Sequence, residues 1–141
     1  VILTGGTREM TGYNGPDGTG AFLRPTVVGN LPHTSRCATE EIFGPMVTLH
    51  TFSTEQDALE MVNASEYGLA GSVWTSDIER GQRFSTQIDS GIVWVNTWLH
   101  RDLRTPFGGV KNSGVGREGG QWSLDFFSEL TNICIKDSDE N

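Results

Sequence analysis

The apolar residues of the chain recur with two different periods in its central part. Residues 44–52 alternate between two faces, one more apolar than the other, and this period of two predicts a β-strand. Ser53 and Gln56 then have the spacing of a capping box, and apolar residues follow at helical intervals until Gly68: Ala58, Leu59 and Val62. We therefore expect a strand followed by a helix.

The same alternation of element types continues towards residue 95. Residues 70–75 predict a short strand, Asp77 is suited to cap a second helix running through Ile88, and residues 91–95 are apolar throughout and predict another strand. The order strand, helix, strand, helix, strand is typical of α/β folds with parallel strands joined by crossovers. The sequence therefore predicts an α/β fold.

The remaining segments are less regular. Residues 1–3 resemble the inside of a buried strand and include no initiator Met, so we expect the N-terminus to be a cut. Residues 5–20 have turn chemistry and predict a loop or two short strands. Residues 21–28 predict an edge or bulged strand because Pro25 cannot donate to a central ladder. Residues 132–136 can form a last strand, which after a long irregular stretch often pairs elsewhere, including with another subunit.

Composition narrows the class of protein. A chain of 141 residues with 35% hydrophobic content predicts one globular unit. The formal net charge of −8 argues against nucleic acid or an anionic membrane as a partner. The sequence shows neither a long apolar run nor a secretory leader, and Cys37 and Cys134 lie outside any metal-binding spacing. We expect a soluble, cytoplasmic protein without a metal site or disulfide.

The segment that directly follows the predicted strand at 91–95 carries the richest chemistry. Ligands of α/β sheets bind beyond the carboxyl ends of strands, so residues 96–107 are where we expect a pocket. Apolar walls would come from Trp98, Leu99 and Phe107, and two guanidinium groups suited to a carboxylate from Arg101 and Arg104. Alternatively, these arginines lie on the surface and pair with Asp102 or other acids.

Three other motifs are weaker. Residues 114–119 match GxGxxG, but a flexible polar loop precedes them where a dinucleotide site needs a strand running in and a helix opening out, so we interpret them as a structural loop. His33 and Cys37 could form an activated thiolate, yet nothing nearby supplies an oxyanion hole. Glu40 and Glu41 are adjacent, point to opposite sides of an extended chain, and should not share a proton.

Several motifs occur in one order along nearly the whole chain. They lie at residues 3–6 (Leu-Thr-Gly-Gly), 22–26, 40–45 (Glu-Glu-Ile-Phe-Gly-Pro), 67–70, 90–96, 106–111 and 113–118. Together they resemble the aldehyde dehydrogenase superfamily. The resemblance implies that residues 1–127 are the C-terminal part of a catalytic domain with a parallel, Rossmann-like sheet. It also implies that residues 128–141 are an oligomerisation strand with an acidic end, which would make the protein a homo-oligomer.

The resemblance also implies roles for single residues. Glu41 would bind the hydroxyls of the nicotinamide ribose of NAD, or of NADP, and Phe43 would pack near the nicotinamide ring. Phe107 would line the substrate tunnel, Glu118 would lie near the route of water and protons, and Arg117 would support a subunit contact. The nucleophilic cysteine, the general base and the Gly-rich cofactor loop of the family lie farther upstream, so the chain would contain no catalytic residue and would be inactive alone.

Residues 96–107, with 117–120 and 129–134, more narrowly resemble the 2-aminomuconic and 2-hydroxymuconic semialdehyde dehydrogenases of aromatic and tryptophan catabolism. Those enzymes oxidise aldehydes that carry a carboxylate, and the resemblance assigns carboxylate recognition to Arg101 first and Arg104 second. Three alternatives stay open: a non-catalytic binding or structural protein, a hydrolase using Cys37 and His33, and a broad-specificity aldehyde dehydrogenase.

Overall fold

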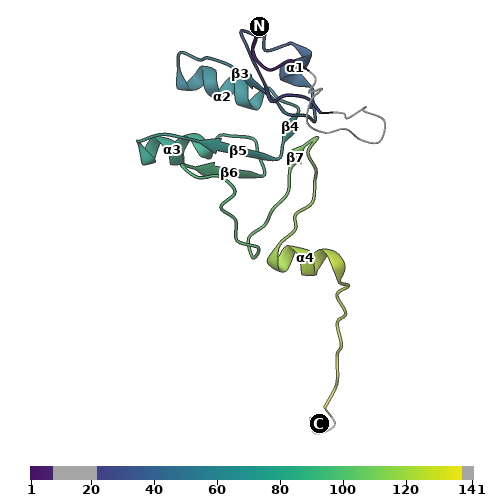
Figure 1. Cartoon of the computed structure of the whole chain (residues 1–141). Helices are drawn as coiled ribbons and strands as arrows, with labels where there is room; N and C mark the ends of the chain where they lie inside the picture. Colours follow the sequence, from purple (N-terminus) through teal and green to yellow (C-terminus); the bar gives the residue numbers. More distant parts are fainter. Residues whose placement is uncertain (8–21, 138–141) are drawn as a thin grey trace, which may run out of the picture. The chain divides into compact units, whose positions relative to one another are not determined.

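The computed structural model describes residues 1–7 and 22–137, so most of the loop expected at residues 5–20 lies outside the described residues. The chain forms two compact units, Val1–Glu66 and Tyr67–Asn141, each described by itself (Figure 1). The chain length predicted a single globular unit, whereas the structure has two. Among the described residues, no helix is both long and apolar enough to cross a membrane.

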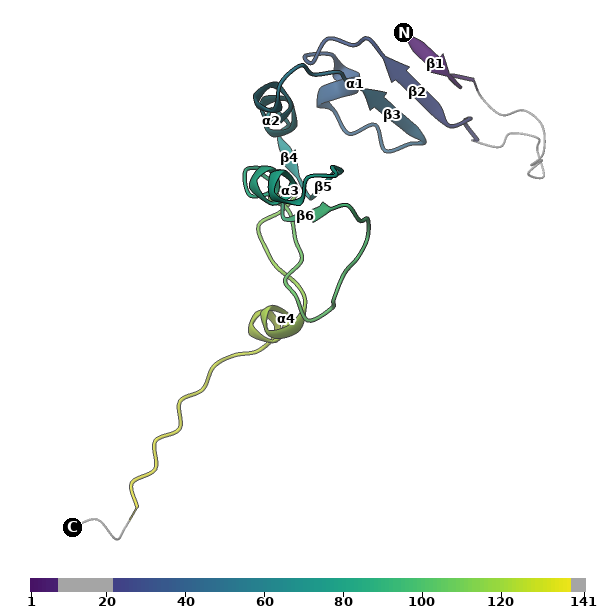
Figure 2. The ribbon, with the colours of Figure 1, turned by 90° about the vertical axis from the view of Figure 1, so that its left-hand side faces the viewer.

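The first unit is built on a three-stranded sheet. Strands β1 (Ile2–Thr4), β2 (Thr26–Gly29) and β3 (Met46–Leu49) lie side by side in that order (Figure 2). The β1 and β2 strands are antiparallel with an irregular register, whereas β2 and β3 are parallel.

Two expectations about this sheet are corrected. The strand expected at an edge or with a bulge is central: Pro25 lies just before its first paired residue and leaves every ladder donor of β2 in place, so only the irregular register of its pairing with β1 agrees with the expectation. The β1 strand is not buried: it lies at the edge of the sheet, and Ile2 and Leu3 are 58% and 55% exposed.

Two helices accompany this sheet. The short α1 helix (Arg36–Thr39) lies in the connection from β2 to β3, and α2 (Glu55–Asn63) follows β3. The capping box of α2 is real but begins one residue later than expected. Thr54 Oγ1 accepts a hydrogen bond from the Asp57 N–H, and the Asp57 carboxylate accepts one from the Thr54 N–H, both at 3.1 Å.

The second unit contains the strand–helix–strand unit that the sequence predicts. Strands β5 (Ala70–Val73) and β6 (Ile92–Val95) are parallel, and α3 (Ile78–Ser85) lies alongside them (Figure 1). The predicted cap of α3 is confirmed, because the Asp77 carboxylate accepts a hydrogen bond from the Arg80 N–H at 3.0 Å. Trp94 of β6 is the buried centre of this unit, at 7% exposure.

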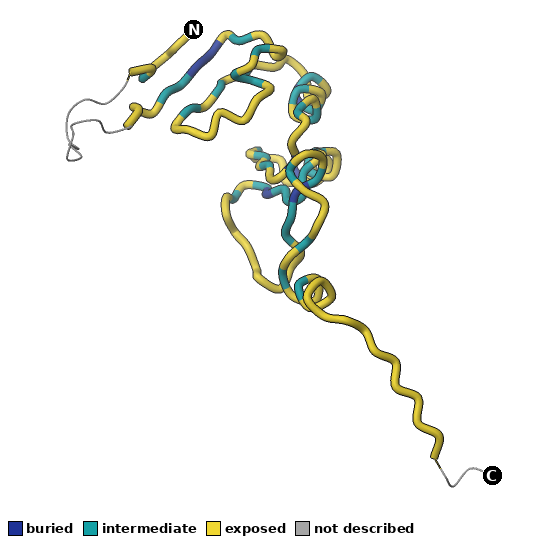
Figure 3. Tube along the Cα trace, turned by 90° about the vertical axis from the view of Figure 1, so that its right-hand side faces the viewer, coloured by how far each residue is buried: buried dark blue, intermediate teal, exposed yellow. Residues whose placement is uncertain are grey.

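The remaining elements depart from the expected pattern. Strands β4 (Tyr67–Gly68) and β7 (Val110–Lys111) form a separate antiparallel pair, and β3 and β5 belong to different sheets, so the described strands do not form one continuous sheet. An unpredicted helix, α4 (Gly120–Phe127), follows. Residues 128–137 form no strand within this chain and are exposed along their whole length (Figure 3).

Candidate functional site

Three of the predicted site residues come together in the second unit. The guanidinium of Arg101 lies over the Phe107 ring, with Cζ 4.1 Å from the ring centroid, and its Nη2 donates to Glu118 Oε1 at 2.8 Å. The Arg101 side chain is 28% exposed and that of Glu118 is 65% exposed. A cation over an aromatic face and against a carboxylate is held in both position and orientation.

Backbone pairing builds this cluster. Phe107 and Glu118 face each other in an antiparallel bridge, in which each N–H donates to the other's carbonyl at 2.8 Å. Beside the bridge, the Gly120 N–H donates to the Leu103 carbonyl at 3.0 Å. A Cβ at Gly119 would lie 2.3 Å from the Thr105 carbonyl oxygen, and φ there is +98°, so only glycine suits this crossing.

The other apolar candidates have different surroundings. The ring of Trp98 lies edge-on to Trp94, with centroids 4.9 Å apart, and the Trp94 indole N–H donates to the His100 carbonyl at 2.7 Å. These contacts hold the segment after β6 against the core of the unit. Leu99 is 67% exposed and has a positive φ of 56°.

Arg104 is engaged elsewhere. Its Nε donates to Asp102 Oδ1 at 2.9 Å, and its side chain is 88% exposed. The hydrogen bond from Arg104 is the main cause that holds the pKa of the Asp102 carboxyl below its usual range. The pairing with Asp102 or other acids that the sequence left open is thus found for both arginines, because Arg104 pairs with Asp102 and Arg101 pairs with Glu118.

A cavity of about 440 Å³ lies beside Glu118. Three of its lining residues belong to α4, a helix that the sequence did not predict: Ser123, Phe126 and Phe127. The apolar residues of α4 were a usable signal, but the helix starts at a glycine and has no side-chain cap.

The GxGxxG segment at residues 114–119 is a structural loop, as predicted, and the α4 helix begins directly after it. The Gly119 N–H donates to Ser123 Oγ at 2.8 Å and the Gly120 N–H to Leu103 O at 3.0 Å. Those two donors are therefore occupied within the chain. Arg117 also serves this loop, because its Nη1 donates to the carbonyls of Gly109 and Gly116 at 2.7 and 2.8 Å.

The two predicted cofactor residues lie in the loop between α1 and β3 of the first unit. Phe43 is 92% exposed with a φ of 54°, and Glu41 is exposed. Glu40 is instead held by Arg36, whose Nε and Nη2 donate to its two carboxylate oxygens at 2.7 and 2.9 Å. That hydrogen bonding lowers the pKa of the Glu40 carboxyl. The two neighbouring glutamates thus have separate surroundings, as expected.

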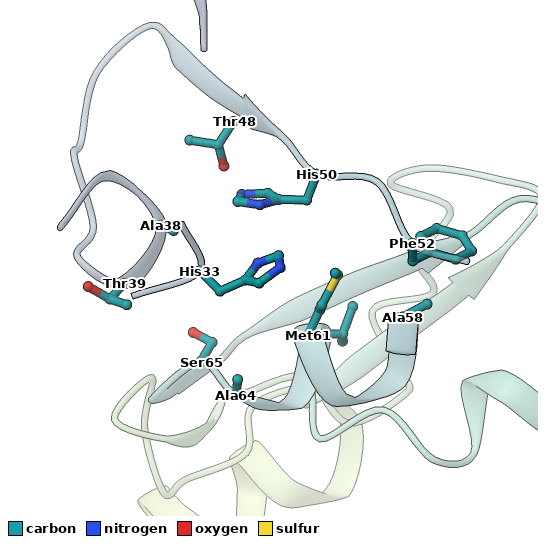
Figure 4. Close-up of a pocket in the computed structure, with 11 residues that line it drawn as sticks. His33, Ala38, Thr39, Thr48, His50, Phe52, Ala58, Met61, Ala64 and Ser65 are labelled. Atoms are coloured by element: carbon teal, nitrogen blue, oxygen red, sulfur yellow. The ribbon is translucent and has the colours of Figure 1, made fainter. Parts of the chain in front are cut away.

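The first unit also contains a cavity of about 350 Å³ (Figure 4). His33, His50 and Met61 line it, and the two imidazole centroids lie 5.1 Å apart. Cys37 is half-buried and is not among the lining residues. The imidazole of His33 therefore faces His50 in this cavity, which gives no support to a nucleophile made by His33 and Cys37. Among the described residues, no cluster of three or more potential metal ligands occurs.

Comparison with known proteins agrees with the mixed α/β architecture. The aldehyde dehydrogenase family pattern matches residues 2–133. The crystal structure of a Mycobacterium tuberculosis aldehyde dehydrogenase complexed with NAD+ superposes with a TM-score of 0.80 at 42% identity, covering 91% of this chain and 25% of that one. For HpcC from Thermus thermophilus, the TM-score is 0.83 at 38% identity, covering 98% and 28%. The fold is therefore that of an aldehyde dehydrogenase, and the chain belongs to the aldehyde dehydrogenase family.

Two relatives bear on the subfamily. A 2-hydroxymuconic semialdehyde dehydrogenase of Pseudomonas putida is 48% identical over 136 residues, which is 96% of this chain and 27% of that protein. A 2-aminomuconic semialdehyde dehydrogenase of Homo sapiens is 46% identical over 117 residues, which is 83% of this chain and 24% of that protein. The chain thus spans about a quarter of the length of these relatives.

Proposed function

We propose that this chain is part of an NAD-dependent dehydrogenase that oxidises an aldehyde bearing a carboxylate, of the muconic semialdehyde kind, to the corresponding acid. The observation that carries the proposal is the fixed guanidinium of Arg101, which lies on the Phe107 ring and uses one N–H for Glu118. Within the described residues its other donors have no recorded hydrogen bond. The names of the relatives, dehydrogenases of 2-hydroxymuconic, 2-aminomuconic and succinate semialdehyde, support the same substrate class.

Arg101 would select the substrate by its carboxylate. A guanidinium presents two parallel N–H groups to a carboxylate, and this contact is lost with a neutral aldehyde. Phe107 limits the plane in which the guanidinium lies, so the free donors keep one direction. Arg104, exposed and bound to Asp102, is the second candidate for this contact.

The loop with Glu41 and Phe43 suits the nicotinamide end of NAD. Within the described part of the chain, the Glu41 carboxylate has no recorded hydrogen-bond partner, and the Phe43 ring is almost fully exposed, so both groups are available to a ligand. Glu41 would accept hydrogen bonds from the two ribose hydroxyls, and Phe43 would restrict where a flat ring can lie. When bound, NAD supplies the hydride acceptor of the oxidation.

We further propose that the chain represents the later part of the catalytic domain, residues 1–127, followed by an oligomerisation tail. The nucleophile and general base would lie in the rest of the enzyme, so the isolated chain would be inactive. The exposed apolar side chains of Leu130, Ile133 and Ile135 support a tail that pairs with another subunit, which would make the enzyme a homo-oligomer. We expect the enzyme in the cytoplasm.

The test is NAD reduction by the complete enzyme with 2-hydroxymuconic semialdehyde and with a neutral unsaturated aldehyde of the same length. Loss of a hydrogen-bonded charge contact should lower kcat/KM for the semialdehyde about 10- to 100-fold in Arg101→Ala and leave the neutral aldehyde much less affected. The matched control for loss of one guanidinium is Arg80→Ala, because Arg80 lies on α3, is exposed and is close to the capping residue Asp77. Equal rates with both aldehydes in the unmodified enzyme would refute the substrate assignment.

A further inference from the structure

The guanidinium that we assign to the substrate carboxylate already has a carboxylate beside it. Arg101 Nη2 and Glu118 Oε1 are 2.8 Å apart, and no other hydrogen bond of the Glu118 carboxylate is recorded within the described residues. Two anionic groups, one from the protein and one from the substrate, would thus share a single cation. The position of Glu118 therefore affects how strongly Arg101 attracts a second carboxylate.

Glu118 is placed by the same backbone bridge that places Phe107. Residues directly opposite each other in an antiparallel pair carry their side chains on one face. Phe107 and Glu118 are such a pair, and both contact the guanidinium of Arg101. The Phe107 ring and the Glu118 carboxylate, which the bridge holds next to each other, therefore both hold Arg101 in place. Arg101 and Glu118 are 17 positions apart in the sequence.

The contact with Glu118 leaves most of the guanidinium donors unused. Arginine has five N–H donors, and only one hydrogen bond from the guanidinium of Arg101 is recorded in the described part of the chain. The ring of Phe107 covers one face of the group. The remaining edge of the guanidinium can donate hydrogen bonds to a second carboxylate while Glu118 stays in place.

We propose that Glu118 is a positioning residue that orients Arg101 against Phe107 and offsets part of its charge, and so sets the affinity for carboxylate-bearing aldehydes. This inference rests on the proposed function of Arg101. Orientation favours substrate binding, because a held guanidinium loses less side-chain entropy when the substrate arrives. The charge acts in the opposite sense, because two carboxylates near one guanidinium repel each other.

Two substitutions separate these effects in the complete enzyme. Glu118→Gln keeps an oxygen that can accept from Arg101 and removes the negative charge, so KM for 2-hydroxymuconic semialdehyde should fall about three- to fivefold, the scale of a partly exposed ion pair. Glu118→Ala removes the charge and the contact together. Its KM for the semialdehyde should therefore exceed that of Glu118→Gln by about threefold or more.

The readout is the ratio of KM for the semialdehyde to KM for the neutral aldehyde of the same length, with kcat recorded for both. Glu79→Gln on the exposed side of α3 is the control for loss of one negative charge. In Glu118→Gln, this ratio should be lower than in the unmodified enzyme. In Glu118→Ala, it should be higher than in Glu118→Gln.

A ratio that stays at the unmodified value in both Glu118 variants overturns the inference, including the case in which kcat falls equally for both aldehydes. In that case the substrate preference of the unmodified enzyme and its loss in Arg101→Ala would still stand, so the proposed function would survive. If the unmodified enzyme shows no preference, the proposed function and the inference about Glu118 both fail.

Discussion

The side chain of Asn96 forms both of its hydrogen bonds with the main chain of Thr75. Its Oδ1 accepts from the Thr75 N–H at 2.8 Å and its Nδ2 donates to the Thr75 carbonyl at 2.7 Å. Asn96 also has a φ of 54°, a left-handed conformation that asparagine tolerates better than most residues. The chain leaving β6 is therefore tied to the chain leaving β5, which sets the start of the segment leading to Arg101.

Replacement of Asn96 should loosen this segment. Asn96→Ala loses both hydrogen bonds and leaves alanine in a left-handed conformation, at a cost of about 2 kcal/mol. Asn96→Asp keeps the acceptor and the tolerance for positive φ, so its loss should be smaller. Thermal unfolding midpoints of the complete enzyme and its variants should rank the original highest, then the aspartate, then the alanine. Identical midpoints for the two variants would contradict a stabilising role for the hydrogen bonds between Asn96 and Thr75.

A second prediction concerns the close approach of two loops at Gly91. A Cβ there would lie 1.6 Å from the Gly108 carbonyl oxygen, so Gly91→Ala forces the backbone at residue 108 to move. Overpacking of this kind destabilises by about 1–3 kcal/mol. Gly116→Ala in the adjoining loop is the control, because its Cβ would meet nothing within 4 Å. A lower unfolding midpoint is expected for the first variant only, and equal midpoints would argue against the packing at Gly91.

The stability of the first turn of α2 should depend on pH, because its capping box includes the carboxylate of Asp57. The hydrogen bond from the Thr54 hydroxyl is the main cause that lowers the pKa of the Asp57 carboxyl. A lowered folded pKa means that this stabilisation is fully present above the ordinary carboxyl pKa and is lost as pH falls through the lowered value. The start of α2 should therefore open more readily only in acid.

Amide hydrogen exchange of residues 55–58, measured by mass spectrometry, tests this. At neutral pH, Asp57→Asn should exchange faster there than the unmodified enzyme, because an amide is a weaker acceptor at this end of the helix. The difference should shrink as the pH falls through the lowered pKa, because the aspartate then becomes neutral too. A difference that does not change with pH would rule out the ionised carboxylate as the source.

The two arginines of the candidate site should differ in their effect on substrate choice. Arg104 is 88% exposed and bound to Asp102, whereas Arg101 is 28% exposed and held by Phe107 and Glu118. We expect the ratio of kcat/KM for the semialdehyde to that for the neutral aldehyde to fall about fivefold or less in Arg104→Ala, the scale of an exposed charge pair. A larger fall than in Arg101→Ala would reverse the assignment.

Much of the local structure followed from short-range signals. The cap at Asp77 and the apolar run at residues 91–95 correctly predicted α3 and β6, because each signal is complete within a few residues. The α2 capping box was misplaced by one residue because Ser53 and Gln56 have the same spacing as Thr54 and Asp57, and only the structure shows which pair forms the hydrogen bonds.

Features that depend on distant pairing could not be predicted in this way. The central position of β2 is set by its two partners, β1 and β3, which sequence spacing does not specify. The contact between Arg101 and Glu118 likewise requires that Phe107 pair with Glu118. Both residues were candidates from sequence, but for separate roles, because neither carries a local signal of the other.

The β5–α3–β6 unit also has a kinetic consequence. Its two strands pair directly across one short helix, in the register Ala70 with Ile92, so forming it closes only a small loop of chain. Contacts of low sequence separation form quickly, whereas the pairing of β4 with β7, in the register Tyr67 with Lys111, joins residues much farther apart in the chain. During synthesis, this unit should fold soon after residue 95 leaves the ribosome. The segment carrying Arg101 would then pack against a unit that is already folded.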